Sequence, residues 1–152
     1  MTRARTRGFT LLEMLAVIVL VAIAVAAASV AVTQGLASAR VRSASNELAA
    51  ALRATRAQAI VHASERTFEL DTRSNSYREA QRAAVALPKG MQVSMTSAAQ
   101  DAPNAWTGRI RFFPDGSSTG GRITLRADRR EWHVNVSWLT GEVRVQDAVV
   151  AP

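Results

Sequence analysis

Apolar residues form one long, nearly unbroken run close to the start of this chain. Residues 14–32 read MLAVIVLVAIAVAAASVAV, and Ser29 is the one polar residue among these nineteen. In a helix that rises ~1.5 Å per residue, such a run spans ~28 Å, close to the ~30 Å hydrocarbon core of a bilayer. The pattern therefore predicts a membrane-spanning helix.

The next stretch, residues 33–63, alternates apolar and polar positions with a helical period. Its apolar residues recur at steps of seven, four and seven: Val41, Leu48, Leu52 and Ala59. Charged residues fall between them, which is typical of an amphipathic helix. No proline interrupts residues 10–63, so we predict one long helix of ~80 Å. Its second half has an apolar face that needs a sheet to cover it.

The remainder, residues 64–152, predicts short strands separated by turns. Alternating or short apolar segments lie at 67–71, 77–80, 85–87, 91–95, 109–113, 123–125, 132–138 and 143–145. Turn sequences such as Pro114-Asp115-Gly116 separate them. Strands at this spacing indicate antiparallel pairing and an α+β fold, with the strand order over 77–101 left open. Trp132 and Trp138 fall on one strand face, and we expect the tryptophans to lie in the core.

Basic residues precede the apolar run and set its orientation. Arg3, Arg5 and Arg7 lie before it, so the positive-inside rule places residues 1–8 in the cytoplasm and the later domain across the membrane. Without these three charges the net charge falls from +7 to +4. The remaining charge is spread along the chain, which favours an ordinary solvated surface over a nucleic-acid site.

The start of the helix has two local interpretations. Thr10 and Glu13 have the spacing of a capping box, with Thr10 as N-cap. A conventional secretory signal is also open, with the small residues 26–28 as its cleavage site. Neither interpretation explains why an ionised Glu13 is kept at an apolar boundary, where a charge is costly without a partner.

Residues 7–13, Arg-Gly-Phe-Thr-Leu-Leu-Glu, resemble the class III signal of type IV pilins and pseudopilins. The resemblance implies that a prepilin peptidase cuts after Gly8 and methylates the new N-terminal Phe9. It also implies that the apolar helix stays attached, and that Glu13 pairs with the free amine of a neighbouring subunit's Phe9. Thr10 keeps its capping role. The expected segments are a leader at 1–8, a membrane or filament-core helix at 9–32, an amphipathic helix at 33–63 and a periplasmic β-rich domain at 64–152.

Two stretches of the second half narrow the resemblance. RFFPDGSSTGG at 111–121 and the alternating 132–143, which ends Trp-Leu-Thr-Gly-x-Val, are similar to the minor pseudopilin H family of type II secretion. The resemblance implies a type IV pilin-like fold with a long N-terminal helix on antiparallel sheets. It also implies a single-pass inner-membrane subunit with a periplasmic domain. Such a subunit lies near the pseudopilus tip and links other minor pseudopilins to the major one during protein export.

Two alternatives remain beside this interpretation. The broader family includes a FimT-like branch, for which we would expect DNA binding and a dense C-terminal basic patch, whereas residues 142–147 are mixed in charge. The other alternative is a soluble periplasmic protein that loses a conventional signal.

No catalytic residue, metal site or cofactor is expected. The chain has no cysteine, and its two histidines, His62 and His133, are far apart in sequence. We therefore expect a non-enzymatic protein whose partners are pseudopilins, the prepilin peptidase and the inner membrane, with nucleic acid excluded from the main interpretation.

Overall fold

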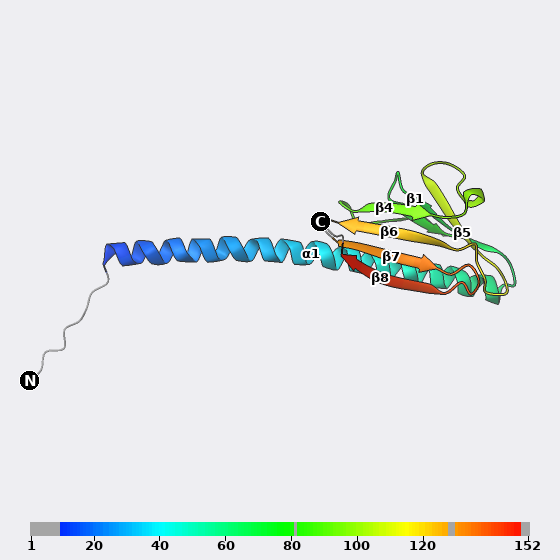
Figure 1. The fold of residues 1–152 in the computed structure, drawn as a ribbon, viewed down its shortest axis with the longest axis horizontal. Helices are drawn as coiled ribbons and strands as arrows, with labels where there is room; N and C mark the ends of the chain where they lie inside the picture. Colours follow the sequence, from blue (N-terminus) through cyan, green and yellow to red (C-terminus); the bar gives the residue numbers. More distant parts are fainter. Residues whose placement is uncertain (1–9, 81, 128–129, 150–152) are drawn as a thin grey trace, which may run out of the picture. The chain divides into compact units, whose positions relative to one another are not determined.

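The structure, a computed structural model, describes residues 10–80, 82–127 and 130–149, without the side chains of 28–38, Ala99 and Val149. The chain divides into two compact units, Met1–Leu36 and Ala37–Pro152. Unit 1 contains the first part of helix α1. Unit 2 contains the rest of α1 and the described strands β1 to β8 (Figure 1).

Helix α1 runs from Leu11 to Val61, which confirms the long helix predicted over 10–63. The chain turns away from the helix at Ala63, whose φ of 46° lies in the left-handed region. The Ser64 N–H donates to the Ala59 carbonyl at 3.1 Å, and the Ala63 N–H donates to the Ile60 carbonyl at 3.2 Å. These bonds satisfy carbonyls that the helix end would otherwise leave free, and glycine is the usual residue at such a position.

One face of α1 within unit 2 is buried. Its buried residues are Val41, Ala44, Ser45, Leu48, Ala49, Ala51, Leu52, Thr55 and Ala59. The two hydroxyls among them are satisfied within the helix, because Ser45 Oγ donates to the Arg42 carbonyl and Thr55 Oγ1 to the Ala51 carbonyl, both at 2.8 Å. The spacing of three, four and seven is the amphipathic period expected from the sequence.

The first sheet has the strand order β3-β2-β1-β5. Its strands are β1 (Arg66–Asp71), β2 (Ser76–Glu79), β3 (Val85–Ala86) and β5 (Thr107–Phe112). All pairs are antiparallel, and β1 lies between β2 and β5 with Phe68 opposite Ile110.

The second sheet has the strand order β4-β6-β7-β8. Its strands are β4 (Gln92–Thr96), β6 (Gly121–Ala127), β7 (Arg130–Val136) and β8 (Val143–Val149). The neighbours β6, β7 and β8 form an antiparallel meander, as the sequence predicts, and β4 pairs antiparallel with β6. A short 3₁₀ helix, Ala99–Asp101, lies between β4 and β5.

A single core joins α1 and both sheets. It includes Leu48 and Leu52 from α1, Phe68 and Phe112 from the first sheet and Val134 from the second. Every buried hydrophobic residue of this cluster lies between Val41 and Val143. Unit 2 therefore has a hydrophobic core of its own.

The expectation that the tryptophans lie in the core is wrong for two of the three. Trp132 is buried, but Trp106 is 54% exposed and Trp138 is 68% exposed. β7 ends at Val136, so the alternation that places Trp138 on the inner face does not extend that far. Trp106 lies before β5, where Arg73 packs over its ring at 5.6 Å from the centroid.

Candidate functional site: the N-terminal assembly motif

Thr10 lies directly before Leu11, at the N-cap position of α1 that the sequence predicts. The Glu13 N–H lies 3.2 Å from Thr10 Oγ1 and 3.1 Å from the Thr10 carbonyl, and the Met14 N–H donates to the same carbonyl at 3.2 Å. The threonine hydroxyl thus accepts from one of the first N–H groups of the helix, which have no carbonyl four residues earlier in the helix to bond with. Glu13 itself lies in the first turn, where a carboxylate also favours the helix dipole.

The other two residues of the motif, Gly8 and Phe9, lie outside the described residues. The structure therefore gives the local setting of Thr10 and Glu13 but does not describe the predicted cleavage and methylation positions. The pairing of Glu13 with another subunit likewise stays a prediction.

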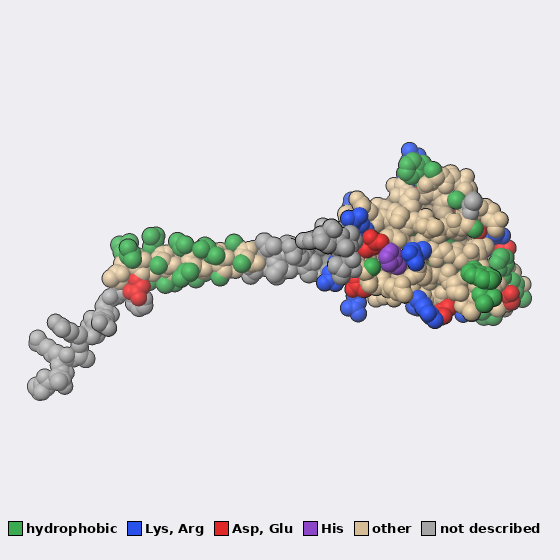
Figure 2. Space-filling model, viewed as in Figure 1, with side chains coloured by type: hydrophobic (Ala, Val, Ile, Leu, Met, Phe, Trp, Pro, Cys, Tyr) green, Lys and Arg blue, Asp and Glu red, His purple; other side chains and the backbone are tan. Residues whose placement is uncertain are grey.

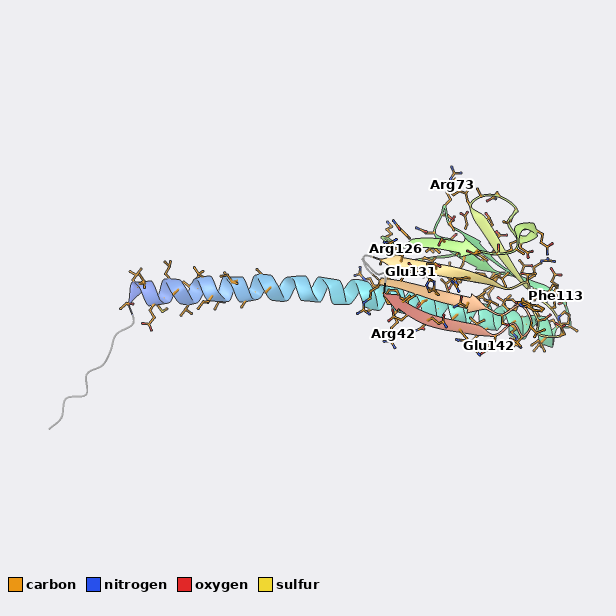
Figure 3. All side chains as sticks on the ribbon, viewed as in Figure 1. Arg42, Arg73, Phe113, Arg126, Glu131 and Glu142 are labelled. Carbon is orange, nitrogen blue, oxygen red and sulfur yellow. The ribbon has the colours of Figure 1, made fainter. Side chains whose placement is uncertain are left out.

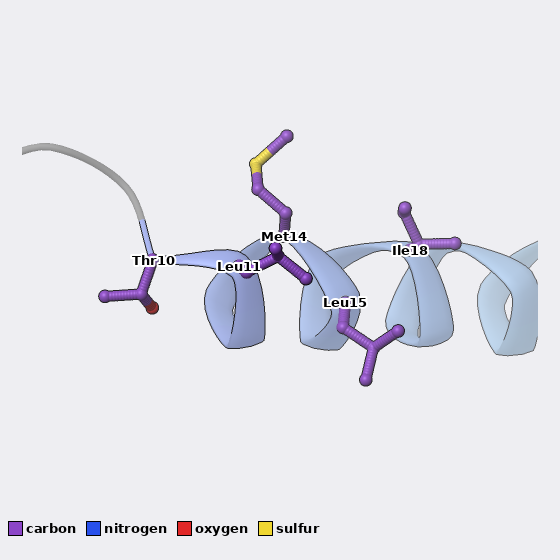
Figure 4. Close-up of a pocket in the computed structure, with 5 residues that line it drawn as sticks. All are labelled: Thr10, Leu11, Met14, Leu15 and Ile18. Atoms are coloured by element: carbon purple, nitrogen blue, oxygen red, sulfur yellow. The ribbon is translucent and has the colours of Figure 1, made fainter.

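The apolar side chains on both sides of Glu13 are exposed. Leu11 is 88% exposed, Leu12 78%, Ile18 64% and Leu20 66%. A shallow hollow lined by Thr10, Leu11, Met14, Leu15 and Ile18 lies along this stretch (Figure 4). Because its walls are neighbouring turns of a single helix, it is an open apolar surface rather than an enclosed ligand cavity.

In the described part of the chain, no helix is both long enough and apolar enough to cross a membrane. The predicted spanning run, 14–32, continues past Ala27 into residues whose side chains are not described.

The stretch RFFPDGSSTGG belongs to a pair of packed turns in unit 2. Arg56 Nε of α1 donates to the Gly116 carbonyl at 2.9 Å. Gly141, in the turn between β7 and β8, has a φ of 62°, and a Cβ there would collide with the same carbonyl. The Ser118 N–H donates to the Trp138 carbonyl at 2.9 Å. The two glycine turns and the arginine therefore form one structural clamp.

The carboxylate of Asp115, which precedes Gly116 in the first of these turns, is held by local hydrogen bonds. Asp115 Oδ1 accepts from Ser117 Oγ at 2.6 Å and from the Ser117 N–H at 2.9 Å. These two bonds lower the pKa of the Asp115 carboxyl from its ordinary value. The folded state favours the ionised carboxylate, so these bonds contribute to the stability of the folded protein. That contribution is present above the ordinary pKa and is lost as the pH falls through the folded-state pKa. The role of Pro114-Asp115-Gly116 is turn formation, as the sequence predicts.

Neither histidine belongs to a metal centre in the described residues, which contain no group of three or more His, Asp or Glu side chains arranged to hold a metal ion. His133 Nδ1 lies 3.2 Å from Thr124 Oγ1, and its Nε2 lies 3.3 Å from a Glu131 carboxylate oxygen. His62 is exposed just beyond the end of α1.

A long helix that packs its second half on antiparallel sheets, with a Thr-x-x-Glu start and an uncovered apolar first half, defines the pilin-like class of protein. Residues 3–29 match the profile of the prokaryotic N-terminal methylation motif. Residues 44–141 match that of the type II transport protein GspH. The chain belongs to this GspH family, whose members are minor pseudopilins of type II secretion.

Individual relatives agree with this family. The chain is 42% identical over 142 residues to the type II secretion system protein H of Xanthomonas campestris, covering 93% of this chain and 84% of that protein. The comparisons thus favour the secretion interpretation over the FimT-like alternative.

The solved structures confirm the fold. The minor pseudopilin EpsH of Vibrio cholerae is similar with a TM-score of 0.56 and 13% identity, over 70% of this chain and 96% of that one. The type IV minor pilin FimU of Pseudomonas aeruginosa gives a TM-score of 0.51 and 15% identity, over 69% and 91%. The predicted α+β, type IV pilin-like fold is therefore confirmed.

Proposed function

We propose that this minor pseudopilin is cut after Gly8, methylated at Phe9 and held in the inner membrane by residues 9–32, with its C-terminal domain in the periplasm. The observation that supports this most directly is the uncovered apolar surface of α1 from Leu11 onward, within the matched methylation motif at residues 3–29. Exposure of such a surface to water is unfavourable, so lipid or other helices must bury it. The membrane supplies the first environment and the helices of a filament supply the second.

Glu13 sets the axial register of the subunit in the filament. It is exposed and surrounded by apolar positions such as Leu12 and Met14, so burying this stretch would isolate its charge. The Phe9 amine of a neighbouring subunit satisfies the carboxylate, and a subunit in the wrong register leaves it unpaired.

The assembled subunit is a structural one rather than an enzyme. It lies near the pseudopilus tip, where it links the other minor pseudopilins to the major pseudopilin during export of periplasmic proteins. The prepilin peptidase and N-methyltransferase is its processing partner.

The first test measures processing. Gly8→Val places a branched side chain at the cleavage position, where the peptidase needs close access to the backbone. We expect intact-mass spectrometry of the membrane fraction to show the uncut precursor, whereas the wild-type chain starts at Phe9 and has one added methyl group. Ala4→Val, the same kind of change inside the leader, serves as the control and should be processed. A mature protein that starts near Ser29 would contradict the proposal.

The second test measures the register. Glu13→Gln keeps the size of the side chain and removes its charge, so processing should continue while the neighbouring amine is left unpaired. Leaving a charge unpaired in apolar surroundings costs about 3 kcal/mol, so we expect cross-linking to the major pseudopilin to fall more than about tenfold. Glu47→Gln is the control, since Glu47 lies on the same helix and accepts from Ser43 Oγ at 3.1 Å. Equal cross-linking in both variants would refute the register role.

A further inference from the structure

Exposed basic side chains gather at one end of unit 2. We call Arg40 and Arg42 of α1, Lys89 before β4, Arg126 near the end of β6 and Arg130 at the start of β7 the basic collar; all five are exposed. Figure 3 shows Arg42 and Arg126 at this end of unit 2, with Glu142 further along it. The register places Arg130 near Arg126, because Ala127 pairs with Arg130. Lys89 lies three residues before Gln92, which is the register partner of Arg126.

The collar has a surplus of positive charge. Figure 2 shows Lys and Arg side chains around this end of unit 2, with some carboxylates beside them. Of those carboxylates, Glu131 lies 3.3 Å from His133 Nε2, and Asp147 lies 3.8 Å from Arg130 Nη1. No ion pair joins Arg40, Arg42 or Lys89 to a carboxylate of the residues that the structure describes. Asp128 and Arg129, between β6 and β7, are opposite in charge and leave the balance unchanged.

The place of Arg40 and Arg42 in the chain points to a membrane surface. They follow Val32, the last residue of the apolar run, by eight and ten residues, which corresponds to about 12 and 15 Å of helix. The polar headgroup layer extends roughly 5–8 Å beyond the hydrocarbon core on each side. Side chains on a helix lean toward its N-terminus, and a long arginine extends its guanidinium further in that direction. Both charges therefore come within reach of lipid phosphates.

A polar hollow next to Arg126 provides a binding site for a lipid headgroup. It is lined by Gly90, Gln92, Arg126 and Ala127 and has a volume of about 430 Å³. Gln92 and Arg126 are register partners across β4 and β6, so an amide and a guanidinium border it together. Gly90 leaves open space on its side, with nothing within 4 Å of where a Cβ would lie. A guanidinium beside amide donors suits a phosphodiester.

We propose that the basic collar docks unit 2 on the anionic phospholipid headgroups of the membrane that holds α1, before the subunit enters the filament. The inference rests on the proposed anchoring by residues 9–32. The leader arginines are removed on maturation, so the collar becomes the basic cluster nearest the bilayer. It holds unit 2 against the membrane through contacts that must break when the subunit is extracted. Anionic lipid attracts each basic residue near its surface, and the attraction fades within a Debye length.

The test uses the full mature chain in nanodiscs, because lipid composition can then be varied alone. The chain has no cysteine, so Gln92→Cys places a single fluorophore at the hollow. A nitroxide on the lipid headgroups quenches the fluorophore on contact. Nanodiscs of phosphatidylglycerol with phosphatidylethanolamine are compared with nanodiscs of phosphatidylcholine. Leu139→Cys, in the turn between β7 and β8, provides a label away from the collar.

We expect quenching at position 92 only in the anionic nanodiscs, and none at position 139. About 1 M salt, where the Debye length is about 3 Å, should release unit 2 from the lipid surface and abolish the quenching. Arg40→Glu with Arg42→Glu should lower the docked-to-undocked ratio at least about thirtyfold, since each arginine near an anionic surface contributes roughly fivefold. Arg73→Glu with Arg144→Glu changes the net charge equally, away from the collar, and should leave docking intact.

Two different failures are distinguishable. A chain that does not enter either nanodisc contradicts the anchoring, and the collar proposal falls with it. A chain that enters both nanodiscs but is quenched equally in them, or equally in the two double variants, leaves the anchoring standing and overturns the collar. Quenching that resists salt also overturns it, because the contact would then not be electrostatic.

Discussion

Gly141 has the least steric freedom among the turn residues of unit 2. It combines a left-handed φ of 62° with a backbone so close to Gly116 that a side chain would strike the Gly116 carbonyl. Arg56 Nε donates to that carbonyl at 2.9 Å and would lie only 2.8 Å from the added Cβ. Two separate constraints, conformation and space, therefore exclude every other residue type at this position.

Gly141→Ala should lower the free energy of unfolding by at least about 3 kcal/mol, from roughly 1 kcal/mol of left-handed strain plus the collision. Gly90→Ala is the matched control, because Gly90 also has a positive φ, of 82°, but open space around it. The control should lose only about 1 kcal/mol. Denaturant unfolding of both variants checks this, and equal losses would show that backbone strain alone acts at Gly141.

At this scale the sequence predicts chemistry better than exposure. The capping position of Thr10 and the turn role of Pro114-Asp115-Gly116 follow from residue type, because both are local. The exposure of Trp138 does not follow from residue type. The apolar alternation of the sequence continues to Trp138, whereas Val136 is the last residue of β7 that pairs with β6. The contact of Gly141 with Gly116 is equally hidden, because it joins residues from two different turns.

Helix α1 shows how an element can end without its usual residue. Ala63 takes the left-handed conformation that closes the last turn, and the bond from Ser64 to the Ala59 carbonyl depends on it. Alanine in this conformation costs about 1 kcal/mol relative to glycine. The end of α1 is therefore held in place by the core rather than by its own sequence.

Ala63→Gly should stabilise unit 2 by about 1 kcal/mol and raise its Tm by roughly 3–5 °C. The same substitution at Ala57, an exposed interior position of α1, should destabilise by about 1 kcal/mol. Thermal unfolding followed by circular dichroism compares the two. Shifts of the same sign would contradict the left-handed assignment.

The elements themselves are largely predictable, whereas their order in the sheets is not. Helix periodicity gives the ends of α1 within two residues, and alternation identifies β1, β5, β6 and β7. It does not show that β1 pairs with β5 across an interval that contains β2, β3 and β4. Pairing of this kind depends on long-range contacts, which no local pattern encodes.

On the scale of the whole molecule, unit 2 contains every contribution to the described core. The cluster begins at Val41 and ends at Val143, while the large apolar side chains described in unit 1, from Leu11 to Val25, are exposed. Folding of unit 2 therefore does not depend on burial of unit 1. The sequence indicates this division through the change from a continuous apolar run to an amphipathic period.

A chain of residues 37–152 should fold cooperatively in water without detergent. We expect its Tm to lie within a few degrees of that of the same unit in the detergent-solubilised full chain, because the buried contacts are the same. Calorimetry of both forms checks this, and Leu48→Ala in both should cost about 2–5 kcal/mol. A truncated chain that stays unfolded would show that residues before Ala37 contribute to folding.

The outer edge of β8 affects whether copies of this protein can associate by pairing their strands. A terminal strand of a sheet offers unpaired backbone groups to any other chain, which is a common route to aggregation. Here Arg53 Nη2 of α1 donates to the Val143 carbonyl at 3.0 Å, and the charged Arg144 and Asp147 are exposed along the strand. Strand-to-strand addition is thereby discouraged. The edge of this sheet is therefore a poor site for polymerisation.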